Sequence, residues 1–102
     1  MTRGFIGILT VDLHLPDSHS LKEKRGGVKP IIAALQRRHG AAVAEVDHHD
    51  LWQRARITAT VVAREHSEAS RRIDAMVRYV EAHAEMVRIE QAIVVAAEEI
   101  AA

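Results

Sequence analysis

Residues 5–15 alternate strictly between two sets of side chains, and this period of two limits the possible folds more than any other feature of the chain. The first set is apolar or glycine: Phe5, Gly7, Leu9, Val11, Leu13 and Leu15. The second set is mixed: Ile6, Ile8, Thr10, Asp12 and His14. A strand buried on one face shows this pattern, and Pro16-Asp17 predicts its end.

A helix is predicted directly after this strand. Ser20 and Glu23 stand three residues apart, as in a capping box, and Gly40 marks a helix end. Between them, apolar residues recur at helical spacing: Leu21, Val28, Ile31, Ile32 and Leu35. Two glycines and Pro30 lie inside this pattern, and an interior proline costs a helix about 3 kcal/mol. We therefore expect a kink or break at 26–30.

The rest of the chain predicts two strands, a helix and a final strand. The strands are expected at about 42–48 and 51–63, followed by a helix capped by Ser67 and a strand at about 86–92. Helical spacing then returns in the tail, at Ile93, Ala96, Ala97 and Ile100. The order βαββαβ favours an α+β ferredoxin-like sandwich, with a four-stranded antiparallel sheet and two helices on one face.

Length and composition narrow the class of protein. The 102 residues predict one domain at 1–95 and a short tail at 96–102 that can form a helix. Fourteen Lys and Arg balance fourteen Asp and Glu, and there is no cysteine for disulfides, thiolate zinc sites or thiol catalysis. The first apolar run is too short to span a bilayer and is interrupted by Asp12, so we expect a cytoplasmic protein without membrane contact.

Two pairs of sequence stretches stand out as more specific than a cap or strand pattern. They are LHLP at 13–16 with SHSLKEKR at 18–25, and VAEVDH at 43–48 with DLWQRA at 50–55. Together they resemble the YlxP-like family, a group of small bacterial proteins of unknown function. The resemblance implies the same ferredoxin-like fold and a gene neighbourhood often shared with transcription and translation factors. It implies no activity, no catalytic residues and no cofactor.

The predicted topology gathers polar residues at one end of the sheet, where the first strand ends and the 47–51 hairpin turns. The expected polar cluster is Asp12, His14, Glu45, Asp47, His48, Asp50 and Trp52. It has two interpretations, a functional site or a network that fixes the hairpin to the helix start. The Trp52 indole is expected to be structural and to cover the end of the core.

Metal binding and catalysis are the chemical alternatives at this end. Glu45 and Asp47 share a predicted strand face, and His14 or His48 could complete a nitrogen and oxygen ligand set. The D-H-H-D run has no recognised ligand spacing, so we expect no metal. An Asp47–His48 orienter and base would have to point from opposite faces of a strand unless the turn rotates one of them. An enzyme is therefore not the favoured interpretation.

Positive charge is concentrated in the first predicted helix. Residues 18–40 carry six Lys or Arg against Glu23, whereas 81–102 carry Arg88 against five glutamates. A helix start and these cations suit phosphate. The expected RNA-contact residues are Ser18, Ser20, Lys22, Lys24, Arg25, Lys29 and Arg54. The chain has only three aromatic residues of the Phe, Trp and Tyr type, which disfavours base stacking.

The outer sheet face predicts a second kind of partner. Its β-branched residues include Ile6, Ile8, Thr58 and Thr60, a composition typical of an interaction surface. We expect a homo-oligomer joined through this face. The sequence thus favours a non-enzymatic module that binds RNA or a ribonucleoprotein such as the ribosome. The alternative is a homo-oligomeric scaffold or regulatory ligand-binding domain without nucleic-acid contact.

Overall fold

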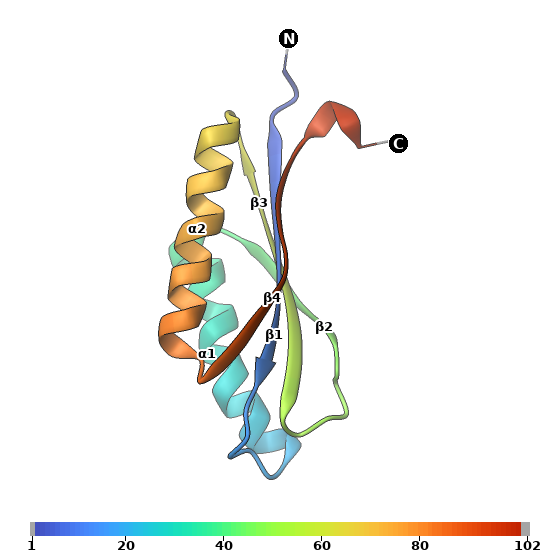
Figure 1. Ribbon diagram of the computed structural model, residues 1–102, viewed down its shortest axis with the longest axis vertical. Coiled ribbons are helices and arrows are strands. Elements are labelled where there is room, and N and C mark those ends of the chain that lie inside the picture. The colour runs from blue at the N-terminus through green and yellow to red at the C-terminus, as the bar shows by residue number, and fades with distance from the viewer. Residues whose placement is uncertain (1, 101–102) are drawn as a thin grey trace.

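The computed structural model describes residues 2–100 and has the predicted order of elements. These are β1 (Phe5–His14), α1 (Leu21–His39), β2 (Ala42–Asp47), β3 (Arg54–Ala63), α2 (His66–His83), β4 (Met86–Ala96) and the 3-10 turn η1 (Ala97–Glu99). The four strands form one antiparallel sheet in the order β2-β3-β1-β4. Both helices cover the same face of this sheet (Figure 1). The ferredoxin-like α+β fold is therefore confirmed.

The core lies between the sheet and the two helices. Alternate residues of β1 and β3 face the helices and are buried, as the period of two predicts. Leu9 and Ile57 are each 1% exposed, and they belong to the same cluster as Leu35 of α1 and Met76 of α2. Within residues 2–100, no helix lies over the opposite face of the sheet, which carries the outer residues of all four strands (Figure 1).

Helix α1 runs without interruption from Leu21 to His39, so the expected break at 26–30 is wrong. Val28 and Ile31 are buried on either side of Pro30, and tertiary packing holds both turns in place. The predicted cap at Ser20 is confirmed, because Ser20 Oγ accepts from the Glu23 N–H at 3.0 Å. The return bond of the capping box is shifted by one residue, since Glu23 Oε2 accepts from the His19 N–H at 2.6 Å and not from that of Ser20. Neither helix of the described chain is both long and apolar enough to cross a membrane.

Three predicted element boundaries need correction. β3 begins at Arg54 rather than at residue 51, and α2 begins at His66, so that Ser67 lies in its first turn and does not cap it. β4 extends to Ala96, where helical spacing had predicted a helix from residue 93. The ten-residue β1 supplies pairing partners along this whole length, ending with Phe5 opposite Ala96. The end of the predicted tail, residues 101–102, lies outside the described residues.

Candidate functional site

The polar end of the β2–β3 hairpin divides into two networks on opposite faces of the sheet. The pairing register shifts between Glu45 and Asp47, so that Glu45 pairs with Ile57 and Asp47 pairs with Arg56. Ile57 faces the helices, whereas Arg56 lies on the outer face. The prediction that Glu45 and Asp47 share one face is therefore wrong, because the bulge reverses the alternation between them.

The inner network is centred on Lys24 of α1, which is only 1% exposed. Its Nζ lies 3.1 Å from Glu45 Oε2 and donates to the carbonyl oxygens of His48 and His49 at 2.9 and 3.2 Å. One ammonium thus ties the first turns of α1 to the hairpin. The prediction that Lys24 contacts phosphate is wrong, since its charge is buried and already partnered.

The outer network is centred on Asp12 of β1, which is 5% exposed and lies directly opposite Arg56. Arg56 donates from Nε to Asp12 Oδ1 and from Nη2 to Oδ2, each at 2.9 Å. This bidentate hydrogen bonding lowers the pKa of Asp12 and raises the pKa of Arg56. Arg56 was absent from the predicted cluster, and its position directly opposite Asp12 places it on the same face of the sheet.

His48 lies at the turn and adopts φ +66°, the left-handed region that non-glycine residues seldom occupy. The rotation brings His48 Nε2 to 3.7 Å from Asp12 Oδ1, a buried position without a hydrogen-bond partner among residues 2–100. The His48 N–H donates to Asp47 Oδ1 at 2.7 Å, and this bond lowers the pKa of Asp47. Asp47 and His48 therefore lie on the same, outer side of the sheet. The sequence allowed this arrangement only if the turn rotated one of the two residues.

This arrangement does not form an orienter and base pair. Asp47 Oδ1 is 3.9 Å from His48 Nδ1, and Asp12 is occupied by Arg56. Within the described residues, no group of three or more His, Asp or Glu side chains is placed to hold a metal ion. The two networks instead anchor the hairpin to β1 and α1.

The loop before α1 is anchored to the hairpin in the same way. Gln53, which the sequence did not single out, donates its amide N–H groups to the carbonyl oxygens of Pro16 and Ser18 at 3.1 and 3.3 Å. Ser18 is buried, and its Oγ donates to the Ser20 carbonyl at 3.2 Å. With Ser20 used as the helix cap, neither predicted serine is free to bind an anion at the start of α1.

The remaining predicted residues do not converge. Trp52 is 54% exposed, so its expected role as a cover for the core is wrong; it lies in the turn before β3, with the indole in solvent. Asp50 is also exposed, and Arg54 pairs with His14 on the outer side of the sheet. The cations predicted along α1 that do remain exposed are Lys22, Arg25 and Lys29.

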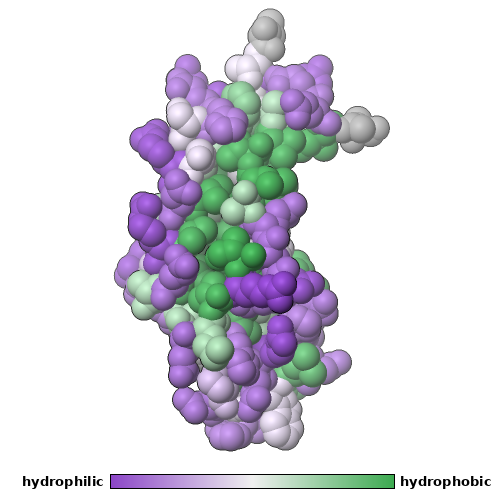
Figure 2. Space-filling view, in the orientation of Figure 1, coloured by the Kyte–Doolittle hydropathy of each residue, from purple (hydrophilic) through white to green (hydrophobic). Residues whose placement is uncertain are grey.

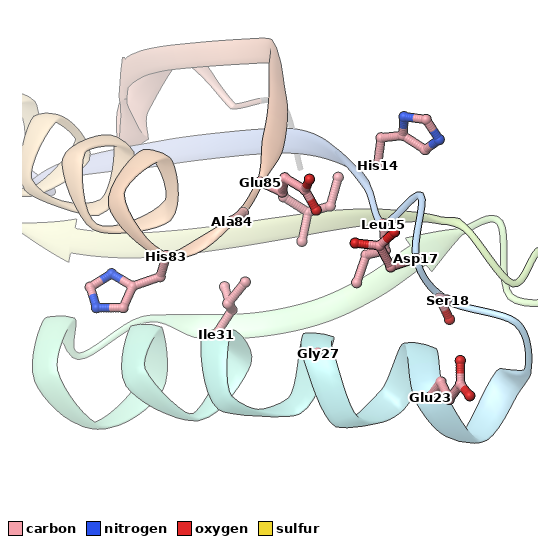
Figure 3. Close-up of a pocket in the computed structure, with 11 residues that line it drawn as sticks. His14, Leu15, Asp17, Ser18, Glu23, Gly27, Ile31, His83, Ala84 and Glu85 are labelled. Carbon is pink, nitrogen blue, oxygen red and sulfur yellow. The ribbon is translucent and has the colours of Figure 1, made fainter.

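A cavity of about 290 Å³ lies between α1, the β1–α1 loop and the α2–β4 turn (Figure 3). Leu13, Leu15 and Ile31 line its apolar side, and the carboxylates of three acidic residues surround it: Asp17, Glu23 and Glu85. The rings of His14 and His83 turn away from the space between Leu15 and Ile31 in Figure 3. The sequence did not identify this cavity, because its walls come from segments that are far apart along the chain. The pattern of each segment alone predicts only a strand, a helix cap or a turn.

Comparisons with known proteins match this chain to a family whose function is unknown. The family described as "Protein of unknown function (DUF503)" matches residues 6–93. The uncharacterised protein YlxP of Bacillus subtilis is 24% identical over 83 residues, which cover 81% of this chain and 90% of that protein. A crystal structure of a dimeric ferredoxin-like protein from an uncultured marine organism is 13% identical with a TM-score of 0.44, covering 100% of this chain and 95% of its own.

Proposed function

This chain belongs to the DUF503 family of unknown function, and we propose that it is a non-enzymatic module that contacts RNA, alone or in a ribonucleoprotein such as the ribosome. The contact is made to phosphates by the exposed cations of α1. The cytoplasmic location expected from the sequence is part of the same proposal. The observation that carries it is a set of helix cations that the rest of the described chain leaves without ion pairs.

The exposed cations of α1 are Lys22, Arg25, Lys29, Arg37 and Arg38. None of them has a carboxylate within 4 Å in the described part of the chain, where the ion pairs are made by other residues. Lys22, Arg25 and Lys29 follow the spacing i, i+3 and i+7, which places them along one stripe of the helix. A stripe of unpaired cations suits the regularly spaced phosphates of a nucleic-acid strand.

This proposal uses fewer residues than the sequence predicted. Lys24, Ser18 and Ser20 are engaged within the chain. Arg54 precedes the inward-facing Ala55 on β3 and so lies on the sheet face opposite the helices. RNA held along α1 is therefore out of reach of Arg54, which becomes a useful control.

The test is the salt dependence of binding to a fluorescently labelled single-stranded RNA, measured by anisotropy. The double variant Arg25→Gln, Lys29→Gln should lower the slope of log K against log salt by about 1.4, at about 0.7 for each phosphate that is no longer neutralised. Arg54→Gln, an exposed arginine on the other face, should leave the slope unchanged. No binding at low salt, or an equal slope in the double variant and the native protein, would contradict the proposal.

A second candidate is a homo-oligomeric scaffold or regulatory ligand-binding domain that does not contact nucleic acid. Apolar side chains left in solvent favour self-association: Met86 is 51% exposed and Ile93 is 39% exposed. The residues that the sequence placed in the interface, Ile6, Ile8, Thr58 and Thr60, are only half-buried by their neighbours on the outer face. Sedimentation of the RNA-free native protein at micromolar concentration should give a mass above the monomer, and a monomer at all accessible concentrations would contradict this candidate.

A further inference from the structure

The edge strand β4 is exposed on both faces as well as along its free side. Met86, Ile89 and Ile93 are 51, 37 and 39% exposed, whereas the inward residues of β1 are almost fully buried. In the sheet order β2-β3-β1-β4, β4 pairs only with β1. Figure 2 shows the result as one band of apolar side chains along the course that β4 takes in Figure 1. A helix could pack on only one face of such a strand, whereas a further strand would pair with its free edge and place side chains beside those of β4 on both faces.

The backbone of β4 also has unpaired groups in a regular phase. The Ala97 N–H donates to the Gly4 carbonyl at 2.9 Å. This bond shows which residues in the C-terminal half of β4 direct their backbone groups toward β1 and which direct them away. Val95 and Ile93 then direct their backbone groups toward β1. Ala92, Val94 and Ala96 direct theirs away from the sheet, where they form the donors and acceptors of a free edge.

The free edge of β4 lacks the charged residues, prolines and bulges that usually prevent an edge strand from pairing with another chain. Residues 91–97 read QAIVVAA and contain no charged residue and no proline. The irregularity in pairing with β1 lies between Thr10 and Val11, before this segment begins. The other edge strand, β2, has only six residues and carries Glu45 and Asp47. Of the two edge strands, β4 is therefore the one with a long edge that no charge or proline protects.

We propose that a second copy of this chain pairs with β4, antiparallel, about a two-fold axis at Val94. In this register Val94 lies opposite Val94 of the second copy, and the outward backbone groups of Ala92 meet those of Ala96. On the outer face Ile93 lies opposite Val95, a pair of β-branched side chains of the kind that stabilises antiparallel strands. Residues 91–97 fit a second copy of themselves because they are apolar on both faces of the strand. Their free backbone N–H and C=O groups also belong to alternate residues, as an antiparallel partner requires.

The inference deepens the self-association candidate and rests on it, but it is independent of RNA binding. A two-fold axis perpendicular to the sheet makes one continuous eight-stranded sheet from the two four-stranded ones. The helices of both copies then cover the same face. The two α1 stripes would face the same side of the dimer but lie at its outer ends, because α2 packs over β1 and β4 and α1 packs over β2 and β3, so pairing through β4 buries neither stripe.

Cysteine cross-linking tests the register, because the native chain contains no cysteine. In a hydrogen-bonded antiparallel pair the two Cα atoms are about 5.5 Å apart, within the range of about 4.4–6.8 Å that a disulfide spans. Val94→Cys should therefore form a covalent dimer under mild oxidation, seen on a non-reducing gel. The matched control is Val62→Cys, an exposed position on the outer face of β3, which should remain monomeric on that gel.

The outcomes separate the register from self-association itself. Cross-linking of Val62→Cys without cross-linking of Val94→Cys would place the interface on the outer sheet face and overturn the β4 pairing, while self-association would stand. A native chain that sediments as a monomer at every concentration would overturn both.

Hydrogen exchange on the native chain gives an answer that does not depend on whether a variant folds. The amides of Ala92, Val94 and Ala96 should be protected at concentrations where the chain is dimeric, and should lose this protection on dilution. The amides of Ile93 and Val95 bond to β1 and should stay protected throughout. Equal exchange of both sets at all concentrations of a dimeric sample would overturn the pairing.

Discussion

Lys24 is a charged residue placed where most proteins put an apolar one. Its methylenes lie in the interior, and its ammonium is held by Glu45 and the carbonyls of His48 and His49. Lys24→Met should therefore leave three acceptors without their donor and lower the free energy of unfolding by about 2–4 kcal/mol. Urea denaturation measures this loss. Lys29→Met, on the exposed side of α1, should change stability by less than about 0.5 kcal/mol, and equal losses in the two variants would contradict the role of Lys24.

Trp52, unlike Lys24, is expected to contribute little to stability although its side chain is large. At 54% exposure the indole contributes little to the core, so Trp52→Ala should cost less than about 1 kcal/mol, where a buried tryptophan would cost about 3–5. Thermal unfolding is the measurement, with Leu13→Ala as the buried comparison expected to cost about 2–5 kcal/mol. A comparable drop in melting temperature for both variants would show that the indole is covered in solution.

Among the elements, α1 carries two neighbouring glycines with different surroundings. A Cβ at Gly26 would meet no atom within 4 Å, whereas a Cβ at Gly27 would lie 2.8 Å from Leu15 Cδ2. Gly26→Ala should stabilise the protein by about 0.5–1 kcal/mol, because alanine restricts the unfolded chain and favours the helix. Gly27→Ala should gain less, since Leu15 must move to admit the methyl group. Chemical denaturation of the two single variants compares them, and an equal gain would contradict the close packing of Leu15 on α1.

The elements were predictable where a single period runs through them and where local rules act alone. Alternation along β1 predicted its inward face, and the spacing of Ser20 and Glu23 predicted the start of α1. The candidate site was not predictable to the same depth, because a bulge after Glu45 and a left-handed His48 redirect the side chains of the hairpin. Both features depend on backbone geometry that residue spacing does not encode. The burial of Lys24 is a tertiary effect, since the hairpin carbonyls that accept from it are 24 and 25 residues away along the chain.

At the scale of the whole molecule, the two proposed surfaces lie on different parts of the fold. The exposed cations follow α1, whereas the apolar surface follows β4, and the sheet separates α1 from the outer network around Asp12 (Figure 1). RNA binding and pairing through β4 therefore do not compete for the same residues. This separation allows each surface to be tested by substitutions that leave the other unchanged.

The stability of the whole molecule should fall on acidification in two stages. Burial, together with the charges of Arg38 and Arg72, lowers the pKa of His39 from its ordinary 6.5. Hydrogen bonding by Arg56 lowers the pKa of Asp12 from its ordinary 3.8. In both cases the unfolded chain binds the proton more readily, so the stabilising contribution is complete above the ordinary pKa and is lost as the pH falls toward the folded value.

The first stage should thus begin near pH 6.5 and the second near pH 3.8, the ordinary values of the two groups. Urea unfolding followed from neutral pH down to the acid range below the second stage measures both. His39→Gln should remove the first stage and keep the second. Asp12→Asn should reduce the second stage, because its amide no longer exchanges a proton, and leave the part that belongs to Asp47, whose pKa is also lowered. The variant should be less stable at neutral pH because it lacks the Arg56 ion pair. Stability that rose on acidification below pH 6.5 would contradict the assignment of a neutral imidazole to the folded state.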